Sequence, residues 1–202
     1  MTELMEAPVE SVAIVPAPRK RHRTVAVIVL VTAILTVAAV VTALLLGAGP
    51  SDRQRAAKEV TAGIKAQKAG DLAGAADHYR RAIGLDSRNV YAAYDLGVVA
   101  GAQGDVKAAA TAYRKAIAIR PTYEPALFNY GVLLQGQGND SAAIGMYQRA
   151  VKAQPNDPRA HFNLGLMLRS MPKYADDGLA QLQIAVKLDP SLVKQATQKA
   201  SR

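Results

Sequence analysis

A spacing of 34 residues recurs along the C-terminal two-thirds of the chain and limits its fold more than any other feature of the sequence. Small or aromatic residues return at this spacing in three consecutive copies: Gly63, Gly97 and Gly131; Gly70, Gly104 and Gly138; Ala75, Ala109 and Ala143; Tyr79, Tyr113 and Tyr147; and Ala82, Ala116 and Ala150. A fourth copy begins at Leu164-Gly165 and contains one additional residue between Ser170 and Asp177. Such a period indicates a repeat protein in which each unit packs on its neighbours. We place the units at residues 56–89, 90–123, 124–157 and 158–192, followed by a short cap or tail at 193–202.

Each unit predicts two helices joined by a turn. In the second unit, Tyr91, Tyr94 and Val98 share one face of a first helix, and Asp105 is placed to cap a second helix. Pro121 follows that second helix, where a proline removes no needed hydrogen bond. The recurring glycines and alanines let the two antiparallel helices approach closely, with the glycine of the first helix facing alanines of the second. The recurring tyrosine is then expected to fill the space toward the next helix pair.

The repeated pattern resembles the tetratricopeptide repeat (TPR). In the second unit the resemblance is carried by Leu96, Gly97, Gly104, Ala109, Tyr113, Ala116 and Pro121, and in the third by Tyr130, Gly131, Gly138, Ala143, Tyr147, Ala150 and Pro155. It covers residues 56–192 and implies an all-α solenoid of about four helix–turn–helix repeats. The sequence departs from the family pattern in lacking the usual tryptophan, in having Ser87 for a proline, and in having Leu182 for an aromatic residue.

The resemblance also implies a binding surface, because the first helices of stacked TPR units line a concave groove that holds a partner peptide. The positions that would face this groove hold Tyr91, Tyr94, Asp95, Val98, Phe128, Asn129, Val132, Phe162, Asn163, Leu166 and Arg169. Asn129 and Asn163 would hydrogen-bond the peptide backbone, since an amide offers both donors and an acceptor; alternatively, each satisfies a neighbouring helix end. The aromatic residues Tyr94, Phe128 and Phe162 either contact the peptide or fill the core between repeats.

A different kind of segment precedes the repeats. No charged residue occurs from Thr24 to Ser51, and the apolar body of this stretch, Val25 to Leu46, would extend about 33 Å as a helix and so cross a hydrocarbon layer of about 30 Å. The sequence therefore predicts a transmembrane helix at 24–49. It follows a disordered, proline-containing tail at 1–23, which ends in a basic membrane flank made of Arg19, Lys20, Arg21 and Arg23. The alternative is a cleaved signal peptide, whose apolar region usually runs only about 7–15 residues.

The orientation of this helix is predicted from the charges on its two sides. The basic flank favours an N-terminus in the cytoplasm. Arg53, Arg55 and Lys58 lie on the other side, but a long domain translocates largely regardless of its charge. We therefore expect the repeat domain outside the cytoplasm. The Ala/Val/Gly-rich composition, together with the similarity of such anchored repeat proteins to bacterial assembly factors, suggests a single-pass protein of a bacterial plasma membrane.

Charge and motifs argue against several classes of function. The net charge of +9 would suit nucleic acid, but the Lys and Arg residues of the repeats are dispersed and lack the interleaved exposed aromatics of a nucleic-acid groove. The chain has no cysteine, and its only histidines, His22, His78 and His161, lie far apart in the sequence. No nucleophile elbow, phosphate-binding loop or dinucleotide fingerprint occurs. We therefore predict no catalytic residue, metal, cofactor, small-molecule substrate or nucleic-acid partner.

Two functions remain open from the sequence. The first is a membrane-anchored scaffold or adaptor that binds a protein or peptide partner in its concave groove. The second is a structural or assembly subunit of a membrane complex, which would use the span and the C-terminal end as its main contacts. Anchored TPR proteins of this kind are similar to bacterial factors of cytochrome c maturation and cell-envelope assembly.

Overall fold

The computed structural model describes residues 51–193 of the chain. The predicted tail, its basic flank and the predicted transmembrane helix at 24–49 lie outside the described residues, as does nearly all of the predicted cap at 193–202. Within residues 51–193, no helix is both long enough and apolar enough to span a membrane.

The described part is built from helices alone. Its elements are α2 (Asp52–Lys68), α3 (Leu72–Leu85), α4 (Val90–Ala102), α5 (Val106–Ile119), α6 (Glu124–Gly136), α7 (Asp140–Ala153), α8 (Pro158–Arg169), the 3-10 helix η1 (Pro172–Tyr174) and α9 (Ala175–Leu188). The predicted all-α fold class is confirmed for these residues, and no strand occurs among them.

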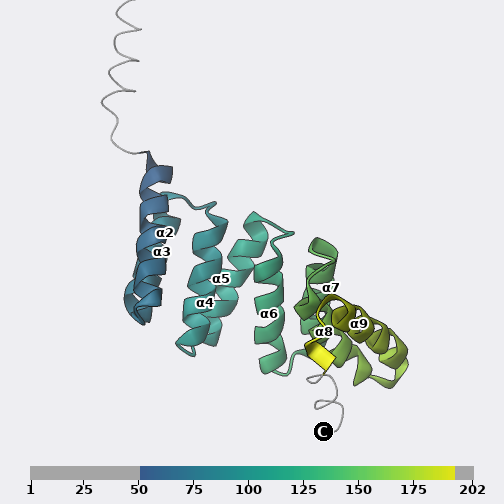
Figure 1. Ribbon diagram of the computed structural model, residues 1–202. Coiled ribbons are helices and arrows are strands. Elements are labelled where there is room, and N and C mark those ends of the chain that lie inside the picture. Colours follow the sequence, from purple (N-terminus) through teal and green to yellow (C-terminus); the bar gives the residue numbers. More distant parts are fainter. Residues whose placement is uncertain (1–50, 194–202) are drawn as a thin grey trace, which may run out of the picture. The chain divides into compact units, whose positions relative to one another are not determined.

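The helices form four hairpins that stack in chain order (Figure 1). The hairpins are α2 with α3, α4 with α5, α6 with α7, and α8 with α9, and the second helix of each packs on the first helix of the next. The first helix α4 also contacts the first helices on both sides of it, α2 and α6. In the described part, no pair of second helices makes contacts as extensive as these. The first helices therefore lie on the inner side of the stack's curvature.

The turns inside the hairpins follow the predicted punctuation. Asp105 caps α5, accepting a hydrogen bond of 2.9 Å from the backbone N–H of Ala108. Its neighbour Gly104 has a φ of +78°, a left-handed conformation that glycine adopts without steric strain. Asp71 and Asn139 cap α3 and α7 in the same way. These turns bring each second helix back along its own first helix.

The recurring tyrosines pack within their own hairpins as well as toward the next hairpin. A Cβ atom at Gly97 would lie 2.6 Å from the Tyr113 ring, so this ring rests directly on the glycine of its own hairpin. The sequence predicted alanines against Gly97 and did not predict this ring, which the bare glycine backbone accepts. Tyr113 also reaches the next hairpin, where it meets Tyr130 and Leu133 of α6. In this way the tyrosine of the second repeat joins two hairpins.

The fourth hairpin is closed by backbone contact instead of by a tyrosine. Leu182 stands in the place of the aromatic residue, and the two helices approach each other at Gly165 and Gly178. A Cβ atom at Gly178 would lie 2.5 Å from the backbone nitrogen of Arg169 and 2.8 Å from the carbonyl oxygen of Gly165. The additional residue of this unit falls in the segment containing η1, which replaces the glycine turn of the earlier repeats.

Candidate functional site

The eleven predicted groove residues lie on three first helices, α4, α6 and α8, and we call the surface that they form the first-helix surface. Tyr91 and Val132 are its most exposed members, at 53% and 44%. Phe162 differs, since it is 5% exposed and packs with Leu182 and Leu192. This burial favours the core alternative for Phe162. The eight other residues are half-buried.

Four aromatic side chains gather around α4 and form what we call the tyrosine cluster: Tyr91, Tyr94, Tyr113 and Tyr123. The ring of Tyr123 meets those of Tyr91 and Tyr94 edge to face, at centroid distances of 5.9 and 5.5 Å. The Arg120 guanidinium lies 5.5 Å from the centre of the Tyr91 ring and 5.2 Å from that of Tyr123. Cations are attracted to such ring faces by the aromatic quadrupole.

The two asparagines contact tyrosines of the chain itself. The Asn129 side-chain nitrogen donates a hydrogen bond of 3.0 Å to the hydroxyl of Tyr94, and Asn163 interacts with the hydroxyl of Tyr147. An asparagine amide has two N–H donors and a carbonyl with two lone pairs, so each residue keeps capacity for a further partner. These contacts orient the two amides without using all of their hydrogen bonds.

Asp95 has no hydrogen bond or ion pair among the described residues, although its side chain is half-buried. Burial raises the pKa of its carboxyl to about 6. Burial also raises the pKa of Tyr79 and Tyr94, and the negative charge of Asp95 raises both further. The same charge contributes at Tyr123, whose pKa is raised to about 12 chiefly by burial. Asp95 is therefore an uncompensated carboxylate among tyrosine hydroxyls.

A second group of charges joins the starts of α6 and α8. Arg159 lies 2.6 Å from Asp157 and 3.7 Å from Glu124, and its guanidinium covers the Phe128 ring at 4.8 Å. Glu124 is 5% exposed, and its Oε1 atom has no hydrogen-bond partner. Burial, a hydrogen bond with Asp157 and repulsion from Asp157 raise the pKa of Glu124 to about 7. Burial alone would raise the pKa of Asp157, but its hydrogen bonds with Arg159 outweigh this and lower it.

The comparison with protein families matches residues 57–187 to the family described as the cilia and flagella-associated protein 70 middle TPR-like domain. The chain belongs to this TPR-like family. The matched residues take in the tyrosine cluster and the whole first-helix surface. No curated protein matches the chain.

Solved structures share the fold of this TPR-like domain. The crystal structure of MamA is 22% identical with a TM-score of 0.62, covering 74% of this chain and 85% of MamA. That of YrrB, a TPR protein with an unusual peptide-binding site, is 25% identical with a TM-score of 0.59, covering 65% of this chain and 68% of YrrB. The first TPR of Spaghetti (RPAP3), bound to the HSP90 peptide SRMEEVD, is 20% identical with a TM-score of 0.56, covering 59% of this chain and 94% of that one.

Sequence reasoning missed three residues that shape the site of the TPR-like domain: Arg120, Tyr123 and Glu124. Tyr123 and Glu124 depart from the neighbouring units, whereas Arg120 occupies a place where no residue type recurs. Tyr123 stands where the neighbouring units have the helix caps Asn89 and Asp157, and it makes no side-chain cap of its own. Glu124 stands where the second unit has a buried valine. These departures from the neighbouring units were the signal that could have revealed Tyr123 and Glu124. The repeat pattern held no such signal for Arg120.

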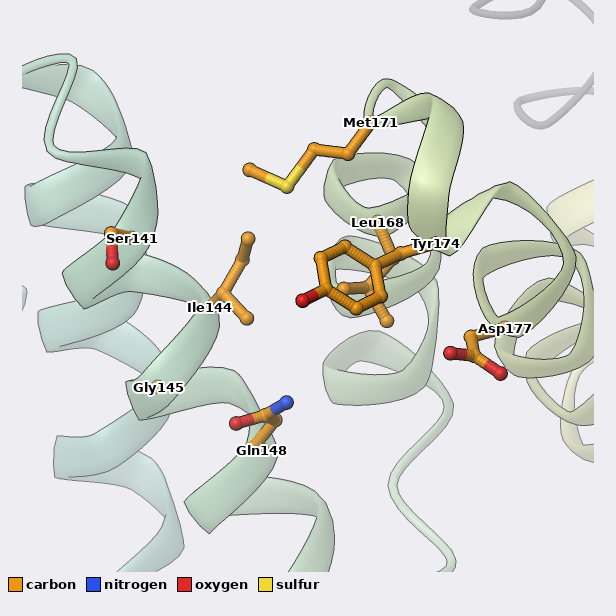
Figure 2. Close-up of a pocket in the computed structure, with 8 residues that line it drawn as sticks. All are labelled: Ser141, Ile144, Gly145, Gln148, Leu168, Met171, Tyr174 and Asp177. Carbon is orange, nitrogen blue, oxygen red and sulfur yellow. The ribbon is translucent and has the colours of Figure 1, made fainter.

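The TPR-like domain has a separate hollow of about 410 Å³ on the side of the second helices (Figure 2). Ser141, Ile144, Gly145 and Gln148 of α7 face Leu168, Met171, Tyr174 and Asp177 from the last hairpin. Figure 2 shows the Met171 and Tyr174 side chains reaching toward Ile144. Because Met171 and Tyr174 belong to the segment with the additional residue, the regular repeat pattern gave no sign of this hollow. No predicted site residue lines it.

The acidic and histidine side chains of the described part do not assemble a metal site. Among residues 51–193, no three His, Cys, Asp or Glu side chains are arranged so that they could hold a metal ion.

Proposed function

We propose that the TPR-like domain is a scaffold that binds a segment of a protein or peptide partner along its first-helix surface. The observation that carries this proposal is a pair of rows running across α4, α6 and α8. Valine, valine and leucine form an aliphatic row (Val98, Val132 and Leu166), and three polar residues form the second row (Asp95, Asn129 and Asn163). Members of each row are 34 residues apart, so they occupy equivalent places on successive helices.

These two rows suit a partner that lies across the repeats. The half-buried asparagines keep carbonyl oxygens for the partner's backbone, and Asn163 also keeps an N–H group, whereas Asn129 contacts the hydroxyls of both Tyr94 and Tyr113. The aliphatic row offers apolar contact to its side chains, and Val132 is 44% exposed. The resemblance to YrrB, a TPR protein with a peptide-binding site, supports the same function for this chain.

Replacing both asparagines should weaken peptide binding while the helices stay formed. The full-length chain, kept in detergent, is panned against a random dodecapeptide library, and the affinity of the selected peptides is measured by fluorescence anisotropy. We expect Asn129→Ala with Asn163→Ala to reduce affinity by about tenfold or more, because each lost hydrogen bond contributes about 1 kcal/mol.

The matched control is Asn156→Ala, which removes an exposed amide from the loop between α7 and α8. It should leave both affinity and far-UV circular dichroism unchanged. If the double variant binds the selected peptides as well as the wild type does, the first-helix surface is not the binding site.

We also propose that residues 24–49 anchor this scaffold in a membrane, with the N-terminus in the cytoplasm and the TPR-like domain on the other side. The length of the apolar stretch and the basic flank before it support this arrangement. Protease added to intact spheroplasts that make the full-length chain should therefore digest the TPR-like domain. Protection of the domain in intact spheroplasts, with digestion only after lysis, would contradict the orientation.

The second candidate function, a structural subunit of a membrane complex, is favoured by apolar residues at the end of the stack. Leu179, Ile184, Leu188 and Val193 are between 38% and 46% exposed. The first three belong to α9, and several exposed apolar side chains on one element often mark a contact surface. If the asparagine double variant still co-purifies with its membrane partners, the result favours this second function over the scaffold function.

A further inference from the structure

Asp95 breaks the polar row of the first-helix surface. The next two repeats have an asparagine at its place, Asn129 and Asn163, and only Asp95 brings a negative charge there. A half-buried carboxylate is destabilised by lost hydration unless a cation or several hydrogen bonds compensate for it. Asp95 has neither among the described residues, and the pKa of its carboxyl is raised by burial alone.

Two arginines beside the first-helix surface are already engaged. Arg159 pairs with Asp157 at 2.6 Å, and Arg120 lies over the Tyr91 and Tyr123 rings. No ion pair joins Asp95 to either arginine within residues 51–193. The contact of Arg120 shows that the tyrosine cluster accepts a guanidinium on its ring faces. A cation brought by a partner would find an unpaired carboxylate beside this cluster.

Apolar residues lie beside this carboxylate. Val98 follows Asp95 by three residues on α4, which places it on the same helix face. Val132 occupies the equivalent place on α6 and is exposed. A partner side chain next to the cation would therefore rest on aliphatic groups.

Accepting the binding function proposed above, we propose that the partner segment carries a lysine or arginine whose side chain pairs with Asp95 beside the tyrosine cluster, with an apolar residue next to it on Val98 and Val132. Specificity then comes from one charge in the second repeat, while the asparagines hold the backbone of any sequence. The inference concerns which peptide binds and rests on the proposed function for where it binds.

The test uses peptides selected from the random dodecapeptide library by the full-length chain. Each selected peptide is resynthesised with every lysine or arginine replaced in turn by glutamine, and affinities are measured by fluorescence anisotropy. For the wild type, one such replacement should weaken binding about tenfold, as loss of a partly buried ion pair would. For Asp95→Asn the lysine and glutamine peptides should bind equally, and selection with Asp95→Lys should enrich glutamate instead.

Asp95→Asn recreates the residue found at this place in the next two repeats, so the helix should tolerate it. The matched control is Asp77→Asn, which removes the same charge from an exposed residue of α3 and should keep the preference for lysine and arginine. Equal weakening of lysine and glutamine peptides by Asp95→Asn would show that Asp95 accepts a backbone N–H, and would overturn the inference. Peptides that bind through the asparagines without any basic preference would overturn it while leaving the proposed function standing. Binding that survives the asparagine double variant, or no peptide binding at all, would overturn both.

Discussion

Replacing Gly178 by alanine is expected to lower the free energy of unfolding by about 2–4 kcal/mol. The new methyl group would lie 2.5 Å from the backbone nitrogen of Arg169 and 2.8 Å from the carbonyl oxygen of Gly165. Because both neighbours are backbone atoms of α8, no side-chain rotation can relieve the overlap. The hairpin must open, and Phe162 and Leu182 then lose their packing in the core beside it. Urea denaturation followed by circular dichroism measures the loss, and hydrogen exchange should place it in α8 and α9.

Gly145→Ala is the matched control for this substitution. Gly145 also lies inside a helix, α7, but nothing is within 4 Å of the position that its Cβ would take. Alanine is favoured over glycine in a helix interior by about 0.5–1 kcal/mol, so this variant should be slightly more stable than the wild type. If Gly178→Ala proved as stable as Gly145→Ala, the close approach of α8 and α9 would be wrong.

The hairpin architecture could be predicted from the sequence because its causes are local and repeated. Gly104 must adopt a left-handed turn, and Asp105 must cap the helix that follows; both requirements recur in the first three repeats and leave a periodic trace. The packing of Tyr113 on Gly97 could not be read in the same way. Periodicity shows that the two residues recur together, but it does not show whether the ring lies within its own hairpin or between hairpins.

In the candidate site, too, the residues within one repeat could be predicted and the contacts between repeats could not. Tyr94 and Asp95 could be assigned to one surface because both belong to one helix, and the TPR resemblance implied which of its positions face the groove. Tyr123 comes from the loop before α6, and only the stacking of two hairpins brings it within 5.5 Å of Tyr94. Glu124 and Asp157 are 33 residues apart and meet because successive first helices begin side by side. A contact that depends on the offset between repeats cannot be derived from the pattern inside one repeat.

Glu124 should make the stability of the domain fall as pH rises, and Glu124→Gln should remove this fall. Burial, a hydrogen bond with Asp157 and repulsion from Asp157 hold the pKa of Glu124 at about 7 in the folded protein, whereas the ordinary pKa of a glutamate is 4.5. Below about pH 4.5 the carboxyl is protonated in both states. Between 4.5 and 7 only the folded state keeps the proton, so each rise in pH favours unfolding, and above about pH 7 the loss is complete.

Glutamine keeps the shape of the protonated acid and offers an N–H donor in place of its O–H, so Glu124→Gln should match the wild type near pH 5 and exceed it by about 1–3 kcal/mol near pH 8. Urea denaturation across this range measures the difference. Glu59→Gln is the control of opposite sign, because hydrogen bonds from His78 and Arg81 lower the pKa of Glu59, and its ionised form stabilises the fold above pH 4.5. That variant should be less stable than the wild type near pH 8. The prediction is contradicted if the free energies of unfolding of Glu124→Gln and the wild type change with pH in parallel. Glu124 would then already be ionised in the folded protein, and Arg159 would compensate its negative charge despite the neighbouring Asp157.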